Sequence, residues 1–282
     1  MKKLFLFLFI LQAYGADYST IRDELLLADD QAHGVTRLNQ VSGNKDFRQL
    51  VDGKIWFLSY GTELYAYASE SVDDTSWGCA WRAIQTTLTA YLRGVPTFKE
   101  LYETYGGRPF MQEQLDELYP EYKDQQWLAP HETWNMWSDP VIGKMILHSL
   151  GIPSTLVSLN GIAPSKSPKV TDVTIDYKTF RRLVLQHFRK GGSPVMIDNS
   201  SYAMNILGAG KWGNHLYLLI GDPHLNFERD ANPLNGLYVV ELDRDGALVE
   251  LVYPMIKNHF DPESYRAFNT FGNQNWNLLF AE

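Results

Sequence analysis

The sequence predicts an α+β fold in which a mainly helical first half carries a thiol and a sheet-forming second half carries a histidine. Apolar side chains recur at helical spacing in residues 80–92, directly after the only cysteine, Cys79. A continuous apolar run at 216–220 suits a central strand. Segments 237–241 and 248–252 flank an Asp-Arg-Asp-Gly turn and predict a β-hairpin. Binding sites usually form in a cleft between two such halves.

The N-terminus predicts a secretory signal peptide. Two lysines precede the apolar run of residues 4–11, and Ala13 and Gly15 supply small residues at positions −3 and −1 of a cut after Gly15. We expect residues 1–15 to be removed and the protein to be secreted or exported, or to remain cytosolic if this segment is not a working signal. The alternative is that the apolar run is the first helix or strand of the domain.

Helical spacing or capping signals in the rest of the first half mark four segments, which are 17–33, 80–92, 98–118 and 137–150. Gly151 follows the last segment as its C-terminal cap. The aromatic stretch 54–67, interrupted by Gly61, predicts a short hairpin or strand pair that leads into the Cys79 loop.

The second half is predicted to be rich in strands. Residues 173–190 have the pattern of a strand followed by a helix, and a Gly-Gly-Ser-Pro turn then leads into a strand at 195–197. The central strand at 216–220 ends at Gly221. The two hairpin strands follow it in the chain.

Composition excludes several functional classes. The formal net charge of −8 argues against nucleic-acid binding, which needs basic patches. With 45% hydrophobic residues the chain can bury one substantial core. The apolar run of residues 4–11 is too short to cross a bilayer, and no second apolar segment is long enough. Neither a glycine-rich phosphate loop nor zinc-ligand spacing occurs, so we expect no cofactor and no metal.

Cys79 is the candidate nucleophile. Because it is the only cysteine, it cannot form an internal disulfide. Gly78 allows close approach of the backbone just before the thiol, and the following helix places Cys79 at a helix N-terminus. Unpaired N–H groups and the helix dipole favour the thiolate there. The alternative is a small buried apolar residue.

Asp222 and His224 are the candidate partners of Cys79. They lie two residues apart at the end of the most apolar strand, so both side chains can point to one side. Pro223 cannot donate to a strand ladder and marks where the chain leaves the sheet. The imidazole would take the proton of the thiol, and the carboxylate would fix the imidazole's tautomer. The alternative is an ordinary turn at a strand end.

The rival among the other histidines is His215, which begins the same strand at its opposite end. The remaining histidines fall in apolar helical patterns, beside a helix end or in loops, and are His33, His131, His148, His187 and His259.

Together these motifs resemble the cysteine proteases specific for the ubiquitin-fold modifier Ufm, the UfSP family. The nucleophile segment Asp73-Asp74-x-x-Trp77-Gly78-Cys79-Ala80-x-Arg82-x-x-Gln85-Thr86 resembles the family's Asp-Asp-x-Gly-Trp-Gly-Cys-Ala-Tyr-Arg-x-Leu-Gln-Thr. The family strand before the acid–base box is matched by Pro194-Val195-Met196-Ile197, with Ala203 and Ile206-Leu207-Gly208 further on. Asp222-Pro223-His224 matches the box itself.

The resemblance implies a papain-like fold with Cys79 as nucleophile, His224 as general base and acid, and Asp222 as its orienter. Tyr67 stands twelve residues before Cys79, where the family has the tyrosine that donates to the oxyanion. The neighbouring Tyr65 is the alternative, and either tyrosine could instead be a core residue. Trp77 would wall a tunnel that accepts glycine, unless it only packs on a helix.

The implied reaction is hydrolysis of a peptide or isopeptide bond after the C-terminal glycine of a ubiquitin-like modifier, through a thioester. The resemblance covers residues 53–282 as a peptidase domain, with 16–52 as an N-terminal extension; the middle, 95–190, is matched only loosely. The sequence departs from the family at Ser76, which replaces a glycine, at Met204, which replaces a histidine, and at Leu225 after the box.

Four alternative functions share this set of residues. The protein could be a secreted cysteine peptidase of other specificity, or an acyltransferase that passes the thioester to an amine. It could be a protease of the autophagy-modifier type, which shares the Trp-Gly-Cys and Asp-Pro-His elements. It could also be a non-catalytic module that binds a modifier on the same fold.

Overall fold

A large, mostly antiparallel sheet forms the centre of the fold. The computed structural model describes residues 35–37, 44–59, 62–124, 127–133, 137–163, 168–224, 234, 236–252, 265–269 and 271–282. They belong to one compact unit spanning 33–282. The predicted signal peptide at 1–15 and the predicted helix at 17–33 lie outside the described residues.

Within this described part, nine strands join in one sheet. The order across it is β10 (Leu248–Val252), β9 (Leu237–Leu242), β8 (His215–Gly221), β7 (Ala203–Trp212), β6 (Val195–Asp198), β11 (Trp276–Ala281), β4 (Ser154–Leu159) and β5 (Val173–Ile175). Only β4 and β5 of this path are parallel. The predicted strands at 195–197 and 216–220 and the hairpin of 237–241 with 248–252 are confirmed.

The predicted hairpin within 54–67 is wrong, although both of its strands exist. The first, β2 (Phe57–Leu58), pairs with β7, and the second, β3 (Glu63–Tyr65), pairs with β1 (Val35–Arg37) in a separate ladder. Glycines in β7 explain this partner choice. A Cβ at Gly210 would lie 1.7 Å from the carbonyl oxygen of Lys54, so the chain leading into β2 approaches β7 more closely than any side chain would allow.

The predicted helices at 80–92, 98–118, 137–150 and within 173–190 are present, with shifted ends. They are α5 (Cys79–Leu88), α6 (Phe98–Tyr105), α7 (Arg108–Leu118), α8 (Pro140–Ser149) and α9 (Tyr177–Arg189), and a shorter α4 (Lys45–Val51) precedes them. Single 3-10 turns span Ser69–Ser71, Pro120–Tyr122, Pro130–Glu132, Tyr265–Phe268 and Phe271–Asn273.

Helix α5 ends four residues earlier than its apolar spacing predicts. Side-chain hydroxyls in its last turns bond the backbone, from Thr87 to the carbonyl of Ala83 at 3.0 Å and from Thr89 to that of Thr86 at 2.7 Å. Such bonds compete with the helical pattern. Gly151 follows α8 with φ of +68°, as the predicted C-terminal cap requires.

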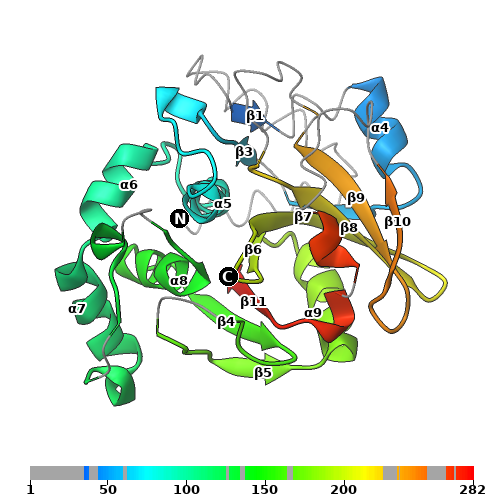
Figure 1. Cartoon of the computed structure of the whole chain (residues 1–282). Helices are drawn as coiled ribbons and strands as arrows, with labels where there is room; N and C mark the ends of the chain where they lie inside the picture. The colour runs from blue at the N-terminus through cyan, green and yellow to red at the C-terminus, as the bar shows by residue number, and fades with distance from the viewer. Residues whose placement is uncertain are drawn as a thin grey trace, which may run out of the picture. The chain divides into compact units, whose positions relative to one another are not determined.

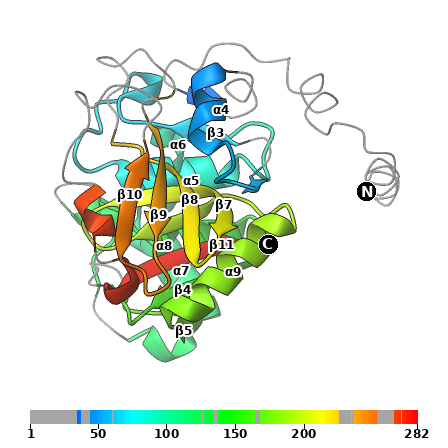
Figure 2. The same cartoon turned by 90° about the vertical axis from the view of Figure 1, so that its right-hand side faces the viewer.

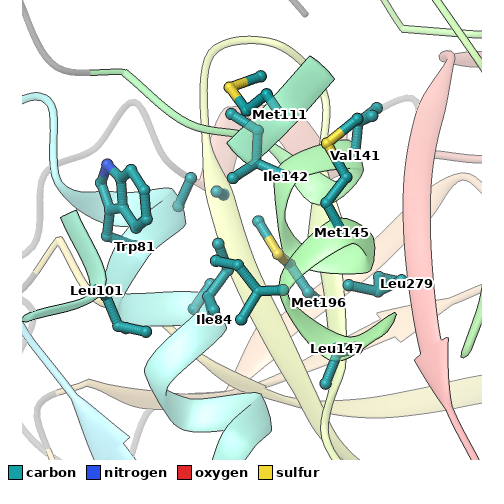
Figure 3. Close-up of a cluster of buried hydrophobic side chains, with 14 of the residues drawn as sticks. Trp81, Ile84, Leu101, Met111, Val141, Ile142, Met145, Leu147, Met196 and Leu279 are labelled. Carbon is teal, nitrogen blue, oxygen red and sulfur yellow. The ribbon is translucent and has the colours of Figure 1, made fainter. Parts of the chain in front are cut away.

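Helices cover both faces of the sheet. In Figure 1, α8 and α9 lie on opposite sides of the strands around β6 and β11, and Figure 2 shows the same strands turned by 90°. On the α5 and α8 face, Met196 packs among Ile84, Met145 and Leu279 (Figure 3). On the α9 face, Val195 and Ile197 pack with the aromatic side chains of Phe180, Phe188, Phe268, Phe271 and Trp276. Alternating residues of β6 therefore enter two different cores.

This arrangement confirms the predicted α+β class: the helix that starts at Cys79 packs on a mostly antiparallel sheet whose strand β8 ends just before Asp222. None of the helices that the structure describes is both long and apolar enough for a membrane span.

Candidate active site

Cys79 is the first residue of α5, as the sequence predicts. The residue before it, Gly78, is the N-cap and has no side chain to cap the helix. Cys79 is only 6% exposed. Its sulfur therefore lies in a buried position at the positive end of a helix, where backbone N–H groups favour negative charge.

A tight loop before Cys79 is organised by Asp74. The backbone N–H groups of Gly78 and Trp77 donate to the carbonyl of Asp74 at 2.9 and 3.2 Å. The carboxylate of Asp74 accepts from the backbone N–H of Ala68 at 2.9 Å and from Arg82 Nε at 2.8 Å. A Cβ at Gly78 would come within 2.1 Å of Asp74 Oδ2, which explains why glycine precedes the thiol.

Arg82 joins this loop to the helix. Its guanidinium is fully buried and donates to Glu70 Oε2 at 2.8 Å, to the carbonyl of Ser69 at 2.8 Å and to Gln85 Oε1 at 3.0 Å. Gln85 in turn donates to the carbonyl of Pro96 at 3.0 Å. The aspartate, arginine and glutamine of the nucleophile motif thus form one buried network that fixes the first turn of α5.

His224 and Asp222 are brought together at the end of β8. His224 Nδ1 lies 2.5 Å from Asp222 Oδ1, which also accepts from the backbone N–H of His224 at 2.9 Å. The hydroxyl of Tyr238 donates to Asp222 Oδ2 at 3.3 Å. Because both oxygens of Asp222 are engaged, the imidazole is held in one orientation with Nδ1 toward the carboxylate.

The second nitrogen of His224 faces the sulfur. Cys79 is hydrogen-bonded to the side chains of His224 and Tyr67 and to the backbone of Ala203. Burial opposes ionisation of the thiol, but these bonds and the positive charge of His224 outweigh it and lower the pKa of Cys79. Burial also opposes charging of the imidazole, yet the charge and hydrogen bond of Asp222, together with Cys79, hold the pKa of His224 well above its usual range. These shifts favour a thiolate on Cys79 and an imidazolium on His224.

Tyr67 lies against both partners. Its ring meets that of His224 edge-on, with centroids 5.3 Å apart, and its hydroxyl donates to the sulfur. Burial and the thiolate raise the pKa of Tyr67 far above its ordinary value, so the hydroxyl keeps its proton. For the alternative, Tyr65, the backbone N–H donates to Thr86 Oγ1 at 3.1 Å, which ties β3 to α5.

Two other sequence candidates make contacts outside this group. The ring of Trp77, half-buried, packs edge-on against Phe98 at 5.2 Å between centroids. His215 begins β8 at the end opposite Asp222, and its Nδ1 hydrogen-bonds Glu241. The structure thus gathers Cys79, His224 and Tyr67 with Asp222 and leaves His215 apart.

Sequence reasoning missed several residues around this group. Asn205 Nδ2 donates to the carbonyl of Ala83 and to Thr87 Oγ1, both at 3.1 Å, and so holds α5 on β7. Tyr202 packs edge-on against His224 at 5.2 Å, and Glu70 and Tyr238 bond Arg82 and Asp222. No motif marks these positions, because each acts through a contact distant in sequence.

In the described ranges, no three His, Cys, Asp or Glu side chains come together as a possible metal site. The chemistry that this arrangement can perform is nucleophilic attack by a thiolate, with an imidazolium as proton donor and a tyrosine hydroxyl beside the sulfur.

Comparison with known proteins places the same region in a family. The profile of Peptidase family C78 matches residues 54–238, a stretch that includes Tyr67, Cys79, Asp222 and His224. The chain is 25% identical over 191 residues to Ufm1-specific protease 2 of Mus musculus, covering 64% of this chain and 35% of that protein. It is 25% identical over 174 residues to Ufm1-specific protease 2 of Homo sapiens, covering 58% and 31%.

A probable Ufm1-specific protease 2 of Drosophila melanogaster is 24% identical over 184 residues, covering 62% of this chain and 26% of that protein. The aligned region thus spans between about a quarter and about a third of the length of these relatives. Among solved structures, that of UfSP from C. elegans matches 80% of this chain and 34% of its own, with 17% identity and a TM-score of 0.43.

Proposed function

Because the chain belongs to peptidase family C78, a family of cysteine peptidases, we propose that it hydrolyses peptide or isopeptide bonds through a thioester on Cys79. The observation that carries this proposal is the hydrogen-bonded series from Asp222 to His224 to Cys79, with Tyr67 on the sulfur. An activated thiol, an oriented base and a neutral donor at one point are the parts that acyl transfer by cysteine requires.

The proposed steps assign one role to each group. The Cys79 thiolate attacks the scissile carbonyl, and the oxyanion accepts hydrogen bonds from the Tyr67 hydroxyl and the Cys79 backbone N–H. The imidazolium of His224 gives its proton to the departing amine and leaves an acyl thioester. His224 then takes a proton from water, and the hydroxide attacks the thioester. The carboxylic acid leaves, and the Cys79 thiolate and the imidazolium of His224 are restored. Asp222 orients the imidazole throughout.

The relatives named above are Ufm1-specific proteases, which supports a ubiquitin-like modifier of the Ufm type, or its conjugates, as the substrate. We place Trp77 as a wall of a narrow passage that accepts the glycine at the end of such a modifier. Residues 53–282 would form the peptidase domain with 16–52 as an extension, and residues 1–15 would direct secretion or export.

The test is covalent capture of the thiol by modifier proteins whose C-terminal glycine carries a propargyl group. Residues 16–282 are offered Ufm-type, autophagy-type and ubiquitin probes, and the wild type is compared with Cys79→Ala and His224→Ala. We expect an adduct with the Ufm-type probe that both substitutions abolish. An adduct with the autophagy-type probe alone would instead assign the protein to that class.

Two further outcomes would replace the proposal. Release of the acyl group to an added amine in preference to water would indicate a transferase. Absence of adducts with every probe, together with a thiol no more reactive than free cysteine near neutral pH, would leave a binding module. Fractionation of a reporter fused to residues 1–20 tests export separately.

A further inference from the structure

Strand β6 ends in a buried carboxyl group that the proposed mechanism does not use. Asp198 is only 2% exposed. Its Oδ1 accepts a hydrogen bond from the backbone N–H of Ser200 at 3.1 Å. Its Oδ2 is also buried and has no hydrogen-bond partner among the residues that the structure describes.

This carboxyl lies next to the nucleophile. Asp198 is the cross-strand partner of Ala203, whose backbone is hydrogen-bonded to the sulfur of Cys79. Opposite residues in an antiparallel pair have Cα atoms about 4.5 to 5.5 Å apart. Met196, two residues earlier in β6, packs against α5 and α8 (Figure 3), so alternation places Asp198 on the face that carries Cys79.

A second buried acid lies within electrostatic range. Asp139 is the N-cap of α8, fully buried, and its Oδ1 accepts from the N–H groups of Val141 and Ile142 at 2.9 and 3.2 Å. Burial, the charge of Asp139 and the charge of Cys79 raise the pKa of Asp198 well above its usual range, and the bond from Ser200 counteracts this only in part. Burial and these negative charges therefore favour the protonated form of Asp198.

Such a carboxyl is costly unless something completes its hydrogen bonding. A buried polar atom without a partner costs about 1 to 3 kcal/mol. An ammonium or guanidinium group would donate to the open oxygen and would offset the negative charge of Asp139. Charge-assisted bonds of this kind are about twice as strong as neutral ones. A cationic group would therefore supply the partner that Oδ2 lacks and would favour the ionised form of Asp198.

We propose that Asp198 is a specificity-determining residue, which binds a lysine or arginine side chain of the substrate within two residues of the scissile bond. The limit of two residues follows from chain geometry. Asp198 lies opposite Ala203, whose backbone is hydrogen-bonded to the Cys79 sulfur, and an extended peptide advances about 3.3 Å per residue. The inference rests on the proposed peptidase function and names the class of sequence that the site selects.

The test uses internally quenched peptides with glycine before the scissile bond. Each peptide carries arginine, its neutral analogue citrulline, or norleucine at one varied position. The varied positions are those within two residues of the scissile bond, apart from the glycine itself. At one of these positions, we expect the wild type to cleave the arginine peptide with a kcat/KM about 10- to 100-fold higher than that for the citrulline peptide. This ratio corresponds to the contribution of hydrogen bonds to a charged group. Asp198→Asn should lose this preference and cleave the arginine and citrulline peptides equally well.

The matched control is Glu103→Gln, which removes a charge from a side chain that is 62% exposed and should leave every ratio unchanged. The iodoacetamide reactivity of Cys79 and the melting temperature report whether Asp198→Asn is folded. The arginine-to-citrulline ratio of the wild type tests the inference even if the variant does not fold.

Equal cleavage of arginine and citrulline peptides by the wild type, or an equal loss on all peptides in Asp198→Asn, would overturn the inference. The inference is also overturned if the Cys79 thiol is activated but the enzyme cleaves no peptide of the panel. Failure of the proposed function looks different: Cys79 would then show no reactivity above that of a free cysteine.

Discussion

The backbone N–H of Tyr67 donates a hydrogen bond to the carbonyl of Pro223, at 2.9 Å. This bond joins the strand segment before the nucleophile loop to the turn that carries Asp222 and His224. The backbone of Tyr67 is therefore tied to the residue before His224, and the two rings are in contact as well. A hydroxyl fixed in this way needs no rearrangement to meet a developing oxyanion, which is the condition for strong stabilisation.

Tyr67→Phe should lower kcat about 100- to 1,000-fold, the effect of removing one oxyanion donor. Steady-state hydrolysis of a glycine-ended modifier fusion measures it. The control is Tyr65→Phe, which changes the neighbouring tyrosine and should keep more than half of the activity. A larger loss in Tyr65→Phe than in Tyr67→Phe would transfer the role to Tyr65.

The rate of alkylation of Cys79 by iodoacetamide should depend on pH as a thiolate–imidazolium pair does. A lowered pKa of Cys79 means that thiolate is present above it, and a raised pKa of His224 means that imidazolium is present below it. Both charged forms are present together wherever these two pH ranges overlap. We expect half-maximal alkylation at a pH below 9.0, the ordinary value for the thiol.

His224→Asn removes the hydrogen bond and the charge that favour the thiolate and leaves the burial that opposes it. The alkylation midpoint should then move to higher pH. Hydrolysis in the wild type should decline at alkaline pH, as His224 loses the proton that the leaving amine requires. An unchanged midpoint in His224→Asn would contradict the pairing.

Local patterns in the sequence predicted much of this arrangement. The start of α5 at Cys79 follows from helical spacing after a glycine, and the contact of Asp222 with His224 follows from alternation at a strand end. Both depend on residues close together in the chain, where periodicity determines which side chains share a face.

The partner of β2 and the roles of Asp198 and Tyr238 could not be predicted in this way. Each depends on a contact across the sheet: β2 with β7, Asp198 with Ala203, and Tyr238 with Asp222. Strand order decides these contacts, and the alternation of one strand carries no information about its neighbours. Asp198 also looks like an ordinary strand-end acid until its burial is known.

Arg82→Met should destabilise the protein by about 3 to 5 kcal/mol, because it leaves the buried carboxylate of Asp74 without its counter-charge. Urea unfolding measures the change. Arg108→Met is the matched control, since Arg108 bonds Glu132 with both side chains more than a third exposed, and such pairs contribute about 0 to 1 kcal/mol. Similar losses in the two variants would contradict the structural role of the Arg82 network.

Asp198→Asn should stabilise the protein more at pH 8 than at pH 4. The folded pKa of Asp198 is raised, so its contribution is full below the unfolded pKa and is lost as the pH rises toward the folded one. Over that window the wild type loses up to about 1.4 kcal/mol per pH unit relative to the variant. Unfolding at both pH values measures the difference, and a difference independent of pH would show that Asp198 titrates normally.

Ser76→Gly should raise the free energy of unfolding by about 0.5 to 1 kcal/mol. Ser76 is exposed and has φ of +75°, in the left-handed region where a Cβ costs about 1 to 2 kcal/mol. Glycine removes that strain but gains about 0.4 to 1 kcal/mol of entropy in the unfolded chain, so a small net stabilisation remains. The control is Thr75→Gly at the preceding residue, whose φ is not positive and which should therefore be destabilised. The midpoints of urea unfolding measure both variants, provided that the denaturant slope is unchanged. If Ser76→Gly loses as much stability as Thr75→Gly, the backbone at Ser76 is not strained.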